Sequence, residues 1–113
     1  MRGKKHFRLL LLVAAALLLS ACEAVKISQI KADPSRYHNK TVAVSGVVVT
    51  SVGLLNRGGY EIEDESGRIF VISDHGVPSG GAHVVVEGTV FSGITILGQS
   101  LGVAIRETKH HIR

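Results

Sequence analysis

Apolar residues alternate with polar ones in several short runs, which is the pattern of half-buried β-strands. The first run, 41–52, places Val42, Val44 and Val48 on one face of a strand. The runs 60–64 and 68–73 flank Glu65-Ser66-Gly67 and predict a β-hairpin. The runs 84–90 and 101–107 supply two further strands, separated from each other by a turn region at 92–100. The chain is therefore expected to be all-β with five strands.

Helix is expected to be a minor component, with one or two turns near residue 27, where the apolar positions Ile27 and Ile30 are three residues apart. Asp33-Pro34 should end or redirect this helix, because the residue before a proline avoids helical angles. Ile27, Ile30 and Tyr37 are predicted to cover one open end of the domain.

The pattern V-x-V-x-G-x-V occurs twice, at 42–48 and again at 84–90. A glycine has no Cβ and so lets a strand bend or bulge sharply, here at Gly46 and Gly88. Two strands bent at matching heights are typical of a barrel. The expected elements match a five-stranded Greek-key barrel, the oligonucleotide/oligosaccharide-binding (OB) fold. They are a long bent first strand, a hairpin of strands two and three, a connection, a fourth strand and a final closing strand.

The run 33–48 resembles the opening of bacterial OB domains of the tRNA-anticodon-binding-like type, and 60–69 and 84–90 are similar to later segments of that family. The resemblance covers about residues 33–107 and implies the fold and, at family level, nucleic-acid binding. The 42–48 motif is more distantly similar to the OB barrel of the haem chaperone of cytochrome c maturation. That family attaches haem through a histidine in an H-x-x-x-Y setting, and no tyrosine follows His110 or His111 here, so no cofactor is expected.

The N-terminus carries four basic residues within its first eight positions, followed by an apolar run at 9–19 that is too short to span a bilayer. This is the pattern of a signal peptide. Leu19-Ser20-Ala21-Cys22 resembles the lipobox of bacterial lipoproteins, which implies cleavage after residue 21 and lipidation of Cys22. The alternative is a plain secreted protein with a buried cysteine. Since Glu23 is not the aspartate of the inner-membrane sorting pattern, we expect the outer membrane, facing the periplasm.

Three segments follow from these signals: a signal peptide at 1–21, a lipidated N-terminus with tether and short helix at 22–32, and the OB-fold domain at 33–113. The single cysteine excludes an intramolecular disulfide. The chain has 13 basic and 9 acidic residues, but four of the basic ones precede Cys22 and all the acidic ones follow it. The side chains from Cys22 onward therefore carry no net charge, which argues mildly against a polyanionic ligand.

The ligand surface of an OB barrel is the outer face of its second and third strands. If Ile62 points inward, alternation directs Glu61 and Glu63 outward, where they would repel a phosphate backbone. The same carboxylates, with Asp64 and Glu65, are of the type that binds Ca²⁺, but alternation divides them between two faces, so a solvated hairpin end is expected and no metal.

Among the aromatic residues, Tyr60 is the predicted stacking residue, and Arg57 and Arg68 are the nearest positive charges. Phe70 and Phe91 are expected in the core or at its rim. The candidate binding residues are thus Tyr60, Glu61, Glu63, Arg57 and Arg68.

No catalytic set is evident: the serines lie outside any G-x-S-x-G elbow, and the paired His110-His111 is expected to be part of a frayed terminus. The sequence therefore predicts a lipid-anchored, non-catalytic OB-fold binding module that recognises an envelope protein or a glycan. The alternative is an OB-fold protein that binds single-stranded or tRNA-like nucleic acid. A third possibility is a structural module that pairs through an exposed strand edge.

Overall fold

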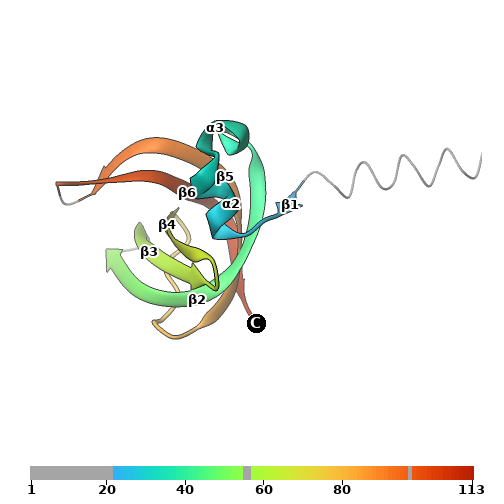
Figure 1. The fold of residues 1–113 in the computed structure, drawn as a ribbon. Helices are drawn as coiled ribbons and strands as arrows, with labels where there is room; N and C mark the ends of the chain where they lie inside the picture. Colours follow the sequence, from blue (N-terminus) through green and yellow to red (C-terminus); the bar gives the residue numbers. More distant parts are fainter. Residues whose placement is uncertain (1–21, 55–56, 97) are drawn as a thin grey trace, which may run out of the picture.

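The computed structural model describes residues 22–113 except 55–56 and 97, so the predicted signal peptide at 1–21 lies outside the described residues (Figure 1). Within the described part, no helix has the length and apolar character needed to cross a membrane. The elements, in chain order, are β1 (Glu23–Ala24), α2 (Ile27–Ala32), α3 (Pro34–Tyr37), β2 (Thr41–Leu54), β3 (Arg57–Asp64), β4 (Gly67–Ser73), β5 (His83–Ile96) and β6 (Gln99–Ile112).

The five long strands close into a barrel. Their order in the sheet is β2-β3-β4-β6-β5, and a second pairing, between β2 and β5, joins the two ends. The contact of β4 with β6 is parallel and short, from Phe70 to Ile72, whereas the other neighbours among these five strands are antiparallel. This closed five-stranded topology with two short helices confirms the predicted all-β OB fold.

The two copies of the valine–glycine motif face each other across the β2–β5 ladder. Gly46 lies opposite Val84, and Gly88 lies opposite Val42. At Gly46, β2 leaves β5 and joins β3, and a Cβ there would be 2.8 Å from the carbonyl oxygen of Glu63. At Gly88, a Cβ would collide with the carbonyl oxygen of Arg106 on β6. The glycines are therefore needed because a neighbouring backbone passes too close for a side chain.

The core is filled by the inward-facing valines and isoleucines of the barrel, and the helices add to it. Ile27, Ile30 and Tyr37 are buried, as the sequence predicts for a covered barrel end. The buried apolar core consists of Ile27, Ile30, Tyr37, Val42, Val44, Val48, Tyr60, Ile62, Ile69, Val71, Val84, Val86, Val90, Val103 and Ile105.

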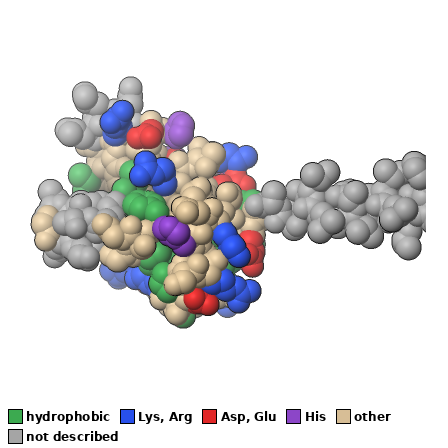
Figure 2. Space-filling model, turned by 90° about the horizontal axis from the view of Figure 1, so that it is seen from above, with side chains coloured by type: hydrophobic (Ala, Val, Ile, Leu, Met, Phe, Trp, Pro, Cys, Tyr) green, Lys and Arg blue, Asp and Glu red, His purple; other side chains and the backbone are tan. Residues whose placement is uncertain are grey.

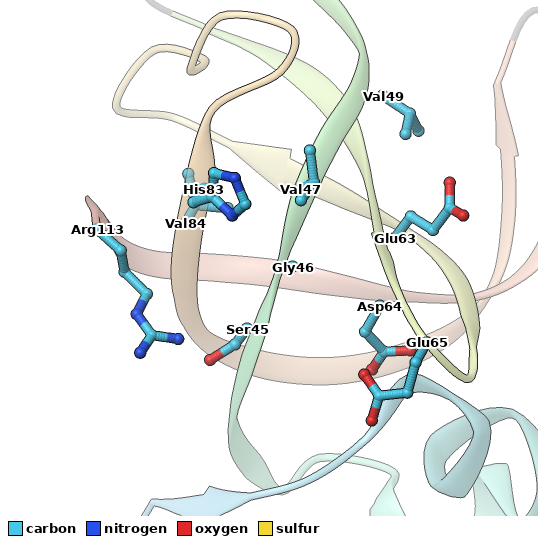
Figure 3. Close-up of a pocket in the computed structure, with 10 residues that line it drawn as sticks. All are labelled: Ser45, Gly46, Val47, Val49, Glu63, Asp64, Glu65, His83, Val84 and Arg113. Atoms are coloured by element: carbon cyan, nitrogen blue, oxygen red, sulfur yellow. The ribbon is translucent and has the colours of Figure 1, made fainter.

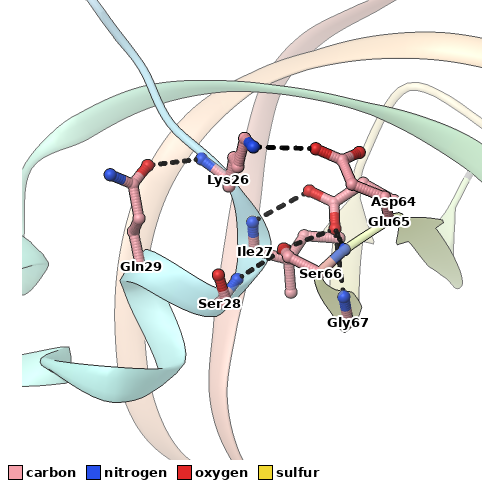
Figure 4. Close-up of polar contacts among 8 residues, drawn as sticks. All are labelled: Lys26, Ile27, Ser28, Gln29, Asp64, Glu65, Ser66 and Gly67. Carbon is pink, nitrogen blue, oxygen red and sulfur yellow. Dashed lines mark hydrogen bonds and ion pairs between the residues drawn. The ribbon is translucent and has the colours of Figure 1, made fainter.

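Asp64 joins the first helix to the β3–β4 turn (Figure 4). Its Oδ2 accepts a hydrogen bond from the backbone N–H of Ile27 at 3.0 Å, and its Oδ1 accepts from the N–H groups of Ser66 and Gly67 at 2.7 and 3.0 Å. Burial alone would raise the pKa of Asp64, but these hydrogen bonds outweigh it and lower the pKa. The carboxylate therefore closes the turn and holds α2 on the barrel end.

Two predictions about the C-terminal part are wrong. The predicted turn region 92–100 is mostly strand, because β5 continues to Ile96 and β6 begins at Gln99. The predicted frayed end is also strand: His110 and His111 lie opposite Val86 and Val85 in the β5–β6 ladder. β6 extends past residue 107, the predicted end of the last strand, because the backbone of β5 continues beside it and pairs with residues 109–112.

Candidate ligand-binding surface

A row of four cross-strand partners, three of them apolar, crosses the outside of the barrel on four adjacent strands. Phe70 alternates with buried Ile69 and Val71 and so faces outward, where it is half-buried. Cross-strand partners share a face of the sheet, so the pairing register identifies the rest of the row. In order, it consists of Glu61 (β3), Phe70 (β4), Ala104 (β6) and Phe91 (β5). We call these four residues the outer row.

The flanking residues shape the outer row. A Cβ on Gly59 would collide with the ring of Phe70, so that ring lies over the glycine. Arg106 places its guanidinium carbon 5.2 Å from the centroid of the half-buried Phe91 ring, a cation–π arrangement. Phe91 and Phe70 both flank Ala104, which is itself fully buried. Together these side chains form a surface with two partly exposed aromatic rings and a cation beside one of them.

The charged residues predicted for the site, Arg57, Glu61, Glu63 and Arg68, lie on or next to this face, and each of them forms an ion pair. Arg68 contacts Glu61 at 3.8 Å and Glu63 at 3.1 Å, while Arg57 lies 3.8 Å from Asp74. All of these side chains are at least partly exposed, so the pairs contribute little stability. These ion pairs balance the charge of the face. Among the described residues, Arg106 is the one arginine of this face that has no ion pair.

Tyr60, by contrast, is not on this surface. It is fully buried, and its hydroxyl donates a hydrogen bond to Oε1 of Glu107, so the prediction that it stacks on a ligand is wrong. The signal that would have placed it correctly is its parity with Ile62, since residues two apart on a strand share a face. The same rule places Phe70 outside, because it lies between Ile69 and Val71, rather than in the core.

The Tyr60 hydroxyl belongs to a buried polar cluster centred on Glu107, whose side chain has no exposed surface. Ser73 Oγ donates to Glu107 Oε2 at 2.7 Å, and His110 Nδ1 lies 2.6 Å from Oε1. A bulge makes this possible: Gly88 pairs with Glu107 but Glu87 pairs with Lys109, so the extra residue Thr108 returns His110 to the inside. Burial, followed by the hydrogen bond to Glu107 and the negative charge of Glu107, raises the pKa of Tyr60.

A second surface feature is a groove of about 680 Å³ where β2 passes from β5 to β3. Figure 3 shows its acidic residues, Glu63, Asp64 and Glu65, on one side of Gly46 and the basic His83 and Arg113 on the other. Asp64 is already occupied by the hydrogen bonds to α2 and the turn. The outer row, with its two partly exposed aromatic rings, is the stronger candidate for a binding surface.

Acidic and basic side chains also lie close to one another in another view of the molecule (Figure 2). On the face seen in Figure 2, acidic and basic side chains are interspersed over the described surface. Within the described ranges, no three His, Cys, Asp or Glu side chains are grouped so that they could hold a metal ion. Cys22 is partly buried beside Glu87. Burial first, and then the charge and hydrogen bond of Glu87, raise the pKa of its thiol, against an opposing effect of Lys109.

Comparison with known proteins supports the fold. No family model and no curated protein matches the chain. Among solved structures, the chain is similar to an aspartyl-tRNA synthetase from Leishmania major (TM-score 0.65, 15% identity) over 82% of this chain and 21% of the synthetase. It is similar to the asparaginyl-tRNA synthetase from Pyrococcus horikoshii (TM-score 0.60, 19% identity) over 78% of this chain and 22% of that one. The chain thus spans about a fifth of each synthetase.

A third similar structure is a small protein of nearly the same extent. It is an OBody bound to hen egg-white lysozyme, with a TM-score of 0.56, 20% identity, and coverage of 68% of this chain and 84% of the OBody. At these identities the likeness concerns the fold, and function must be argued from the residues of this chain.

Proposed function

We propose that this protein is a lipid-anchored, non-catalytic OB-fold module of the bacterial envelope that binds an envelope protein or a glycan on the face of the outer row. The observation that carries this proposal is the outer row itself: two half-buried phenylalanine rings, Phe70 and Phe91, on either side of Ala104. The lipobox-like Leu19-Ser20-Ala21-Cys22 supports the anchor and the outer-membrane, periplasm-facing address.

The charge pattern favours a ligand that is not a polyanion. Arg68 is shared between Glu61 and Glu63, and the side chains from Cys22 onward sum to zero net charge. Protein interfaces are enriched in aromatic residues and arginine and have polar rims, and the outer row with Arg106 and its paired rim charges has this composition. The OBody bound to lysozyme supports the view that a barrel of this shape can take a protein ligand.

Nucleic acid is the second candidate, and two observations favour it. The aromatic rings predicted to lie in the core or at its rim are on the outer face, and single-strand binders stack bases on such rings. The similarity to two tRNA synthetases also supports this candidate more than it supports a protein or glycan ligand. On this alternative, Phe70, Phe91 and Arg106 would be the binding residues.

Crosslinking in cells tests the proposal. A photoreactive amino acid at Phe91 should capture an envelope protein or a glycan, and the same substitution at Ile112, which is 59% exposed but away from the outer row, should not. Phe70→Ala and Phe91→Ala should each weaken binding by at least tenfold, with Ile112→Ala as the control. Intact mass should show acylated Cys22 as the first residue. Crosslinks to nucleic acid alone would replace the first candidate with the second.

A further inference from the structure

The chain is fixed to the barrel from the residue that follows Cys22. β1 pairs in parallel with β2, with Glu23 opposite Val42, and the backbone N–H of Val25 donates to the carbonyl of Ala43 at 3.1 Å. The bond from Ile27 to Asp64 then secures the start of α2. The short tether predicted at the beginning of segment 22–32 is therefore part of the sheet, and it leaves no free linker after Cys22.

This attachment determines how far the barrel can lie from a lipid on Cys22. One extended residue spans at most about 3.6 Å. The headgroup region on each side of a bilayer is about 5–7.5 Å thick, half the difference between the total and the hydrocarbon thickness. With acyl chains in the hydrocarbon, the surface around Cys22 has to lie within or against the headgroups. That surface includes Glu87, which lies beside the thiol, and Lys109, which pairs with Glu87 at 3.1 Å.

The two long hairpins extend in the other direction. In Figure 1, β1 lies on one side of the barrel, while the connected ends of β2–β3 and of β5–β6 lie on the opposite side. A barrel that rests on the β1 side therefore directs both hairpins away from the membrane.

We propose that β1 is a clamp that holds the barrel flush against phospholipid headgroups at the surface formed by Cys22, Glu87 and Lys109, with the hairpin ends directed into the periplasm. The partner of this surface is the bilayer itself. The inference rests on the proposed lipid anchor, and it adds a fixed orientation that the anchor alone does not require.

Spin labels on the lipidated protein test this orientation. Once Cys22 carries lipid, an introduced cysteine is the one reactive thiol, so Lys109→Cys labels the proposed contact surface and Arg57→Cys labels the start of β3 on the hairpin side. The proteins are reconstituted in phosphatidylethanolamine/phosphatidylglycerol vesicles that contain a nickel-chelating lipid. We expect relaxation by the headgroup nickel to be at least threefold greater at position 109 than at position 57.

A matched variant isolates the role of β1. Twelve Gly/Ser residues inserted between Cys22 and Glu23 have a root-mean-square span of about 17–21 Å, enough to release the barrel from the headgroups. In this variant the relaxation at 109 should fall to the level at 57. Equal relaxation at both positions without the insertion, or no effect of the insertion, would overturn the clamp while leaving the lipid anchor intact. Protein that lacks acyl groups by mass and does not float with vesicles would overturn the anchor and the clamp together.

Discussion

Removing the hydroxyl of Tyr60 tests the buried cluster around Glu107. Tyr60→Phe keeps the ring, which is fully buried, and deletes the hydrogen bond to a carboxylate that has no exposed surface. Hydrogen bonds to charged groups contribute about 1.5–3 kcal/mol to stability. For a domain of this size each kcal/mol corresponds to roughly 4–8 °C in Tm, so we expect Tm to decrease by about 6–24 °C.

The matched control is Tyr37→Phe. Tyr37 is also buried, 4% exposed, but its hydroxyl has no hydrogen-bond partner among the described residues. Its loss should change the free energy of unfolding by less than about 0.5 kcal/mol, the usual range for changes that remove no specific interaction. Urea and thermal unfolding of both variants give the comparison. If Tyr60→Phe were as stable as Tyr37→Phe, the Tyr60–Glu107 hydrogen bond would make no net contribution to the stability of the fold, contrary to this prediction.

Two further predictions concern pH and backbone contact. Hydrogen bonds lower the pKa of Asp64 in the folded protein, so the contribution of this carboxylate to stability is complete above its unfolded pKa, about 4, and is lost as the pH falls through the lower folded pKa. Asp64→Ala should therefore reduce the free energy of unfolding by about 0.5–2 kcal/mol at pH 7. Urea unfolding from pH 7 to pH 2 should show that the difference in stability between Asp64→Ala and the unchanged protein disappears. Gly88→Ala should cost about 1–3 kcal/mol or more, since its Cβ meets the Arg106 carbonyl, whereas Gly80→Ala, with open space around it, should be neutral or slightly stabilising in the same thermal melts.

Local pattern was sufficient for much of the fold. The spacing of valine and glycine at 42–48 and 84–90 predicted two bent strands, and the structure pairs them directly. The parity of Ile62 correctly placed Glu61 and Glu63 on the outer face, because side-chain direction in a regular strand depends only on sequence position. Applied to Tyr60, the same parity predicts burial. An aromatic residue close to arginines in sequence can lie on either face of the strand, and only the parity decides which.

Other features depend on contacts that no local pattern contains. His110 would face outward by parity with Glu107, and it faces inward because of the bulge at Thr108, which is set by pairing with β5. The sequence pattern predicts that Asp64 is a solvated carboxylate like its neighbours, yet Asp64 accepts a hydrogen bond from the start of a helix 37 residues away in sequence. The outer row likewise exists only after β4, β6 and β5 are aligned, since its members come from segments that are distant in the chain.

The salt dependence of binding separates the two candidate functions. Each cation that contacts a phosphate makes the affinity more dependent on salt, so the number of cations on the binding face sets the largest slope that can be observed. The outer face carries three arginines, Arg57, Arg68 and Arg106, and two of them are already paired with carboxylates. If all three contacted phosphates of a single strand, the slope of log K against log salt would be about −2, since each phosphate contributes about −0.7. An uncharged glycan, or a protein held mainly by Phe70 and Phe91, should give a slope close to zero. Titrations of the captured ligand at several salt concentrations measure this slope, and a value near −2 that is reduced by Arg106→Ala would contradict the protein or glycan assignment.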